Sequence, residues 1–129
     1  MLPTLCELQS ALVSGATTSL ELTEQALAKA EDPAGQGALV FTRLYRDRAI
    51  ASAQASDLLR RAGVVRSPLE GLPVSIKDLF DIKGEPTQSG SVVLRDAPAA
   101  KHNAVIVERL IRAGAVITGK TNMVEFAYS

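Results

Sequence analysis

The chain has 129 residues, enough for one domain with a modest core. Hydrophobic residues make up 47% and charged residues 22%, as is typical of a globular protein, and 14 basic side chains balance 14 acidic ones. The zero net charge and the absence of Trp argue against a nucleic-acid-binding surface and a polybasic membrane patch. Cys6 and His102 are the only residues of their kinds, which excludes an intramolecular disulfide and a multi-histidine zinc site.

Targeting signals are not evident in the sequence. The N-terminus lacks a basic stretch followed by a long apolar run, and no segment approaches the ~20 apolar residues of a membrane span. We therefore expect no membrane association and a cytoplasmic location.

The first two predicted elements are helices, at residues 4–14 and from Thr18 or Ser19 to about Glu31. Each begins with the spacing of a capping box, in which a threonine precedes a glutamate by three positions. Gly15 suits the end of the first helix.

The middle of the chain predicts a short strand at 38–41 and an alanine-rich helix at 45–62. Residues 72–76 form an apolar run that is flanked by Gly and Pro and is too short for a helix of its own, so we expect a buried strand there. Residues 84–103 are rich in turn formers and predict an irregular loop.

The last part of the chain predicts a helix that Asn103 caps and that runs through Ala113. The β-branched run 115–118 predicts another buried strand. A turn is expected at 119–122, with a new helix beginning near Met123. Continuous rather than alternating apolar strands indicate a sheet covered on both faces, so the predicted fold class is α/β.

One motif invites a nucleotide-binding interpretation. Residues Gly114–Thr121 match G-x-x-x-x-G-K-[ST], the loop that wraps a phosphate in P-loop NTPases. That motif needs a strand before its first glycine and a tight loop within it, whereas a helix is predicted before Gly114 and the residues between favour a strand. We judge the match spurious, but a non-catalytic binding module remains an alternative.

A longer pattern covers essentially the whole chain and is most specific over residues 71–127. In order and spacing it closely resembles the amidase signature family, the Ser–Ser–Lys amide hydrolases. The motifs that carry the resemblance are Gly71-Leu72-Pro73-Val74-Ser75-Ile76-Lys77-Asp78, Pro86-Thr87, Gly90-Ser91, Val107-Glu108-Arg109-Leu110, Gly114-Ala115-Val116-Ile117, Gly119-Lys120-Thr121-Asn122-Met123 and Glu125-Phe126-Ala127.

The resemblance implies that Lys77 is the catalytic base. In the family this lysine is neutral and takes a proton from a serine held in a cis peptide. That serine in turn takes a proton from the nucleophilic serine. The chemistry is reasonable, because desolvation at a strand end disfavours an ammonium charge and a neutral amine can activate a hydroxyl. It also implies a mixed sheet covered by helices on both faces, an acyl-enzyme mechanism, and no cofactor or metal.

The sequence departs from the family where both serines are expected. Only 52 residues follow Lys77, and none forms a Gly-Gly-Ser-Ser-type run. Ser89 and Ser91 do not match the nucleophile. We therefore expect residues 1–129 to be the N-terminal portion of a single amidase domain that carries the lysine but lacks both serines and is inactive alone.

The resemblance also implies a substrate and partners. The substrate would be a small-molecule amide, and Phe126 and Ser129 would border its acyl pocket. The runner-up is the A subunit of a tRNA-dependent glutamyl or aspartyl amidotransferase, with partner subunits and a tRNA-linked substrate. The main interpretation involves no nucleic acid, and a homodimer is left open.

Simpler roles compete for several of these residues. Lys77 and Asp78 could form a surface ion pair at the strand end. Lys120 is expected to be a turn lysine with its ammonium group in water. His102 is expected in an exposed loop, Cys6 as a small packed side chain, and Phe126 could equally belong to the core.

Overall fold

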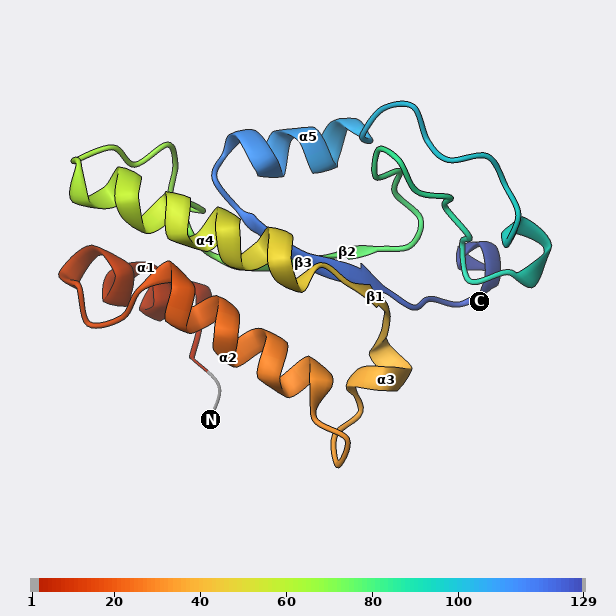
Figure 1. Ribbon diagram of the computed structural model, residues 1–129, viewed down its shortest axis with the longest axis horizontal. Coiled ribbons are helices and arrows are strands. Elements are labelled where there is room, and N and C mark those ends of the chain that lie inside the picture. Colours follow the sequence, from red (N-terminus) through yellow and green to blue (C-terminus); the bar gives the residue numbers. More distant parts are fainter. Residues whose placement is uncertain (1–2, 129) are drawn as a thin grey trace.

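The structure is a computed structural model that describes residues 3–128. Helices and strands are interspersed along the chain, which confirms the α/β class (Figure 1). The elements in chain order are α1 (Leu5–Ser14), α2 (Ser19–Glu31), α3 (Gly37–Val40), β1 (Phe41–Leu44), α4 (Arg46–Arg61), β2 (Pro73–Lys77), the 3₁₀ turn η1 (Val92–Leu94), α5 (Val105–Arg112), β3 (Val116–Thr121) and the 3₁₀ turn η2 (Glu125–Ala127). No helix within residues 3–128 is long and apolar enough to cross a membrane.

Both predicted capping boxes form. Thr4 and Thr18 are the N-caps of α1 and α2, and each exchanges hydrogen bonds with the glutamate three positions later. In the second box the Glu21 amide donates to Thr18 Oγ1 at 3.1 Å, and the Thr18 amide donates to Glu21 Oε2 at 2.9 Å. Two otherwise unpaired amides are satisfied at each helix start.

Removing one box should weaken the fold measurably. We expect Thr18→Ala to lower the free energy of unfolding by about 1 kcal/mol, because the Glu21 amide loses its acceptor at the start of α2. Chemical denaturation of the chain measures this loss. Ser52→Ala, on the exposed face of α4, serves as control and should change the free energy by less than about 0.5 kcal/mol.

The sheet has the strand order β1-β3-β2 and is mixed, as expected. β1 pairs with β3 antiparallel and β2 pairs with β3 parallel. The register of the parallel pair shifts by one residue between Val74 and Ser75. Among residues 3–128, β3 is the only sheet neighbour of β2, so the outer edge of β2 is open.

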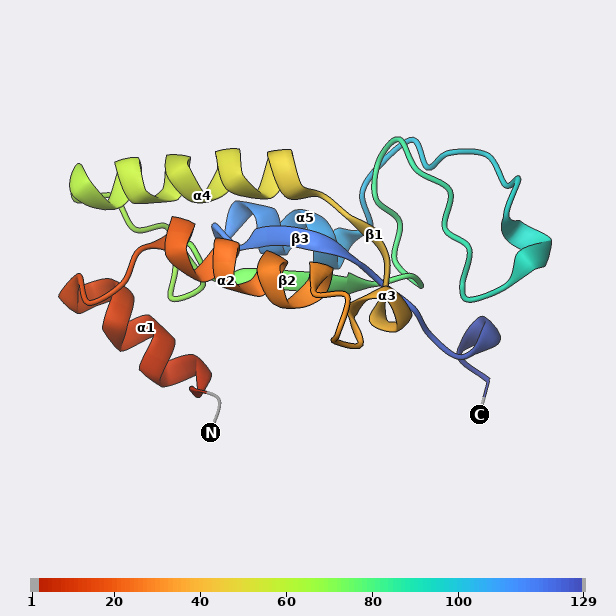
Figure 2. The same cartoon turned by 60° about the horizontal axis from the view of Figure 1, so that its bottom comes forward.

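Helices cover both faces of this sheet, as the apolar strands predicted. α2 and α4 lie side by side on one face, and α5 lies on the other (Figure 2). Two alanines of α4 that are completely buried let that helix approach the sheet closely. The buried residues are Leu27, Ala49, Ala53 and Val116 in the first cluster and Ile76, Ile82, Val107 and Ile117 in the second.

The strand predicted at 38–41 is wrong in position. Gly37–Val40 forms the short helix α3, and extended backbone begins only at Phe41. Gly37 lies so close to the end of α2 that a Cβ there would overlap the Ala30 carbonyl group. The chain reaches β3 only after this close contact, so pairing starts later than the apolar run indicates.

The predicted start of α5 is also wrong by one residue. The N-cap is Ala104, not Asn103, and it makes no side-chain cap bond. The Asn103 side chain instead accepts a hydrogen bond from the Lys83 amide at 2.9 Å and donates to Glu108 at 3.0 Å. It ties α5 to the loop before it. Gly114 ends the helix region with φ +92°, a left-handed conformation that suits glycine.

The turn predicted at 119–122 is replaced by strand. β3 continues to Thr121 because β1 and β2 pair with its two edges over these residues. The helix expected from Met123 is absent from the described residues up to 128, where only the single turn η2 forms. Tertiary pairing therefore overrides the turn preference of Gly119-Lys120.

Candidate active site

The candidate site lies where β2 and β3 end. Because the two strands are parallel, their carboxyl ends point the same way, and the loop after β2 and the segment after β3 meet there (Figure 1). Backbone hydrogen bonds join these parts: the Asp78 amide donates to the Thr121 carbonyl at 3.0 Å, the Ser89 amide to the Asp78 carbonyl at 2.9 Å, and the Phe126 amide to the Ser89 carbonyl at 2.8 Å. Lys77 and Phe126 are thus brought to the same edge of the sheet.

Lys77 is the last residue of β2, as predicted, and its side chain is exposed. Side chains alternate along a strand, so Lys77 projects from the face opposite to Ile76, which packs against α5. Within residues 3–128 its ammonium group has no hydrogen-bond or ion-pair partner. The described part of the chain therefore leaves the Lys77 side chain unpaired and exposed to water.

Asp78 is paired with Lys120 and not with Lys77. The Lys120 Nζ atom lies 3.1 Å from Asp78 Oδ1, and the two side chains are only 3% and 4% exposed. Ile76 and Lys120 are register partners, so this pair lies on the α5 side of the sheet, opposite to Lys77. The alternative of a surface ion pair between Lys77 and Asp78 is therefore excluded, and the prediction that Lys120 is a solvated turn lysine is wrong.

The nucleotide-binding alternative does not match this geometry. Most of the residues that would form the phosphate loop, and Lys120 itself, belong to β3 in extended conformation and pair on both sides. Their amides are used in the sheet, and the lysine that would reach a phosphate is buried against Asp78. The match to the P-loop pattern is therefore fortuitous, as the sequence context indicated.

Phe126 lies in η2 with its ring half-exposed and its backbone in the left-handed region. Its φ is +51°, and the φ of the next residue, Ala127, is +56°. A bulky residue rarely adopts this conformation, and such strain clusters at functional sites. At 53% exposure Phe126 is not a core residue. Ser129, the other predicted substrate contact, lies outside the described residues.

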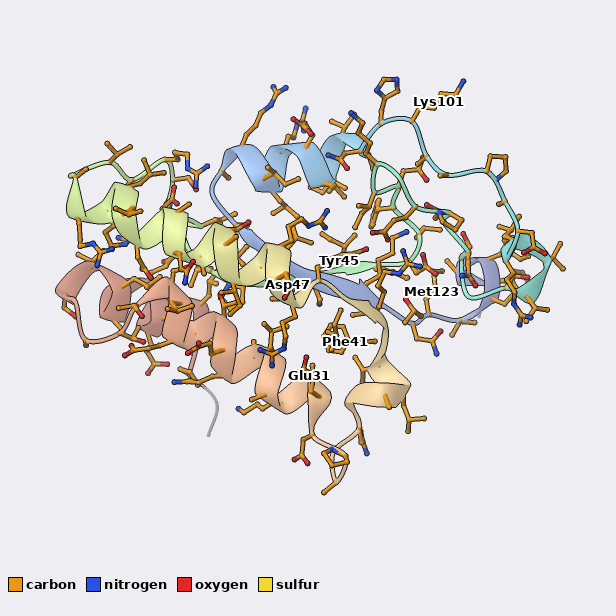
Figure 3. The ribbon with its side chains drawn as sticks, in the orientation of Figure 1. Glu31, Phe41, Tyr45, Asp47, Lys101 and Met123 are labelled. Carbon is orange, nitrogen blue, oxygen red and sulfur yellow. The ribbon has the colours of Figure 1, made fainter. Side chains whose placement is uncertain are left out.

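Three features near Phe126 were not predicted from the sequence. Ser91 Oγ donates to Glu125 Oε1 at 2.5 Å, and Ser89, with φ +52°, is the third non-glycine residue of left-handed backbone. A Cβ on Gly90 would stand 2.5 Å from the carbonyl oxygen of Met123, on the segment after β3 (Figure 3). Residues 89–91 and 123–127 therefore form one tightly packed unit. The sequence signals for it were the Gly90-Ser91 and Glu125-Phe126-Ala127 motifs, which do not indicate that the two segments pack together.

The remaining single residues have ordinary positions. His102 is exposed, as predicted, and its neighbour Lys101 points outward (Figure 3). Cys6 is exposed on α1, so the prediction that it packs is wrong. Residues 3–128 contain no group of three or more His, Cys, Asp or Glu side chains that could hold a metal ion.

The other end of β2 is held by a second buried carboxylate. Glu70 is completely buried and accepts hydrogen bonds from Arg66 Nε at 2.5 Å and Arg66 Nη2 at 2.7 Å. Burial of the Glu70 carboxyl raises its pKa, but the surrounding polar groups, chiefly Arg66 through its hydrogen bonds and its charge, together outweigh burial, and the pKa lies below its usual value. The carboxylate is thus a fixed charge that orders the turn into β2.

The lowered pKa of Glu70 predicts a pH dependence. Its contribution to stability is complete above about pH 4.5 and is lost as the pH falls through the lowered folded-state value. We expect Glu70→Gln to cost about 1–3 kcal/mol in unfolding free energy at pH 7 and less at pH 3, since wild type alone loses the charged partner on acidification. Denaturation at the two pH values measures this. If the difference in unfolding free energy between wild type and Glu70→Gln widened on acidification, the prediction would be contradicted. Glu24→Gln, on an exposed part of α2, is the control.

Comparisons with known proteins show which family this sequence and fold belong to. The Amidase family model matches residues 21–129. The chain is 44% identical to AtzE, which belongs to the 1-carboxybiuret hydrolase of Pseudomonas sp. (strain ADP), over 95% of this chain and 26% of that protein. It is 42% identical to the A subunit of the glutamyl-tRNA(Gln) amidotransferase of Chloroflexus aurantiacus over 92% of this chain and 24% of that one.

A solved structure supports the same assignment. A chain from a structure described as a vestigial protein complex that reveals the origins of an s-triazine catabolic enzyme superposes with a TM-score of 0.88, at 42% identity, over 98% of this chain and 27% of that chain. The chain spans about a quarter of the length of the curated relatives it matches. The family model covers most of the sequence, and the chain belongs to the amidase family.

Proposed function

We propose that this chain supplies the lysine base of an amidase that hydrolyses a carbon–nitrogen amide bond of a small molecule through a Ser–Ser–Lys mechanism. The observation that carries the proposal is Lys77, placed unpaired at the carboxyl end of β2 in a chain of the amidase family. The nucleophilic serine attacks the amide carbonyl, and its proton passes through a second serine to Lys77. The C–N bond breaks as that proton is returned to the departing amine, and water then hydrolyses the acyl-enzyme.

Two requirements of this mechanism are not met by the 129 residues alone. The sequence contains no Gly-Gly-Ser-Ser-type run, so the serines must come from additional polypeptide. Lys77 is exposed, and a neutral amine is favoured only when the ammonium group is removed from water. The polypeptide that brings the serines must therefore also cover this face of β2. A homodimer and a cytoplasmic location stay predictions.

Phe126 is the proposed substrate contact within the described residues. Its half-exposed ring lies on strained backbone at the same sheet edge as Lys77. An apolar ring held in this way offers a wall for the acyl group of an amide. Ser129 comes three positions after Phe126 in the sequence and is proposed to border the same pocket.

A second candidate is the A subunit of a tRNA-dependent amidotransferase. The 42% identity to the Chloroflexus aurantiacus protein supports it. The residues Glu125-Phe126-Ala127-Tyr128-Ser129 are more like the general amidase branch, so we place it second. In this alternative Lys77 keeps its role, and the ammonia released from glutamine is used on a tRNA-linked substrate with partner subunits.

The test is reconstitution. This chain is fused to the C-terminal three quarters of a related amidase, which supplies the two serines, and ammonia release is measured from aliphatic amides, aryl amides and glutamine. We expect the fusion to turn over an amide and the 129-residue chain alone to be inactive. Turnover by the chain alone that Lys77→Ala abolishes would overturn the proposed division of the site. Activity on glutamine alone would favour the amidotransferase alternative.

A further inference from the structure

The buried ion pair of Asp78 and Lys120 serves no step of the proposed mechanism, because it lies on the opposite face of the sheet from Lys77. Buried charges are costly, and an apolar pair of similar volume often gives an equally stable fold. Stability alone therefore does not account for the pair. Its other contacts show which segment it holds in place.

Both partners of the pair reach the loop after β2. Lys120 Nζ lies 3.4 Å from the Pro86 carbonyl oxygen and 3.5 Å from Thr87 Oγ1, and the Gln88 amide donates to Asp78 Oδ1 at 3.4 Å. The individual bonds are long, but they converge on three successive residues. The ion pair is the centre of a polar cluster that joins the ends of two strands to residues 86–88.

Separate contacts hold the part of the loop just before this cluster. Glu85 accepts a hydrogen bond from the Tyr45 hydroxyl at 2.6 Å and pairs with Arg43 at 3.4 Å. Burial and the neighbouring Glu85 carboxylate raise the pKa of Tyr45, so its hydroxyl stays a donor. Tyr45 lies where β1 passes into α4 (Figure 3). The loop is therefore anchored at Glu85 without the ion pair, and the pair acts on the residues C-terminal to Glu85.

Immediately C-terminal to the cluster lies the strained unit that carries Phe126. Residue 89 has left-handed backbone, and its amide and carbonyl join Asp78 to Phe126 through bonds of 2.9 and 2.8 Å. Ser91 adds a bond to Glu125. Left-handed backbone at three non-glycine residues persists only where surrounding contacts enforce it, and the ion-pair cluster is the adjoining buried contact.

We propose that Asp78 and Lys120 are positioning residues that hold residues 86–91, and through Ser89 the backbone of Phe126, in the conformation required at the sheet edge. In the proposed amidase, on which this last point rests, the pair thereby sets the position of the Phe126 ring against the acyl group of the substrate. The pair acts on substrate binding rather than on proton transfer, since it does not face Lys77.

The test is hydrogen exchange of single amides in the 129-residue chain, with the apolar variant Asp78→Leu/Lys120→Met. This variant removes both charges together, so no charge is left buried alone. The exchange protection of the Ser89 and Phe126 amides is expressed relative to that of the Val116 amide, which donates to the Leu72 carbonyl inside the sheet. The control Glu31→Gln/Arg46→Gln removes an ion pair between α2 and α4.

We expect the Ser89 and Phe126 protection ratios to fall at least about tenfold in the apolar variant and to stay unchanged in the control. A smaller fall, or no protection of these amides in wild type, would overturn the proposal. This readout needs no turnover, so it stands even if the amidase assignment fails. In the active fusion the variant should raise KM more than it lowers kcat; an unchanged KM would overturn the substrate part.

Discussion

Lys77→Ala should reduce the turnover of the reconstituted amidase by at least about 10³-fold. A base that accepts the proton of a relay serine cannot be replaced by a methyl group, which has no lone pair to take it. The loss should be in kcat, because Lys77 is proposed to act on the serines and not to bind the amide. Steady-state kinetics of the fusion measures it.

Two controls separate catalysis from folding in this experiment. Lys77 is exposed, so Lys77→Ala should change the free energy of unfolding by less than about 0.5 kcal/mol. Lys101→Ala, at a lysine that points outward, should leave turnover unchanged (Figure 3). A small primary amine added to Lys77→Ala should restore part of the rate by acting as the missing base. Turnover within tenfold of wild type would show that Lys77 is not the base.

Lys120→Met should have the largest effect on stability, a loss of about 3–5 kcal/mol. The substitution keeps the approximate length of the side chain and removes its charge, so the Asp78 carboxylate is left buried without a cation. Denaturation at neutral pH measures the loss. Lys83→Met, at an exposed lysine of the loop after β2, is the matched control and should lie within about 0.5 kcal/mol of wild type.

The double variant tests the cause of this loss. If the unpaired carboxylate is responsible, Asp78→Leu/Lys120→Met should recover most of the stability, because both charges leave together. A loss below about 1 kcal/mol in Lys120→Met would contradict the buried pair. A loss that the second substitution does not recover would assign the effect to packing rather than charge.

The sequence was sufficient to predict structure where backbone groups form hydrogen bonds with residues close to them in the sequence. The capping boxes at Thr4 and Thr18 and the end of α1 at Gly15 involve groups within a few residues of each other, and all three form as predicted. The apolar run before Lys77 likewise predicts β2 without knowledge of the rest of the fold.

Prediction from the sequence failed where the conformation or contacts of a residue depend on a partner far away in the sequence. Lys120 follows a glycine and looks like a turn residue, but β1 and β2 extend the strand through it, and Asp78, far away in the sequence, neutralises its charge. Asn103 has the residue type of a helix cap, but its side-chain oxygen accepts a hydrogen bond from the Lys83 amide instead. Lys77 is proposed as the base only through the family pattern, since strand periodicity does not distinguish a base from a solvated lysine.

The open edge of β2 has a consequence for how such a chain avoids misassembly. Exposed strand edges recruit other chains, and a charged residue on the edge is a common protection against this. In any state in which only residues 3–128 are folded, Lys77 is the charge at the end of that edge. Burying the Lys77 ammonium group costs free energy, which would discourage an unrelated apolar strand from pairing with this edge. A segment that brings hydroxyl groups to the ammonium would offset that cost and could pair there. The residue proposed as a catalyst would thus also select the polypeptide that completes the sheet.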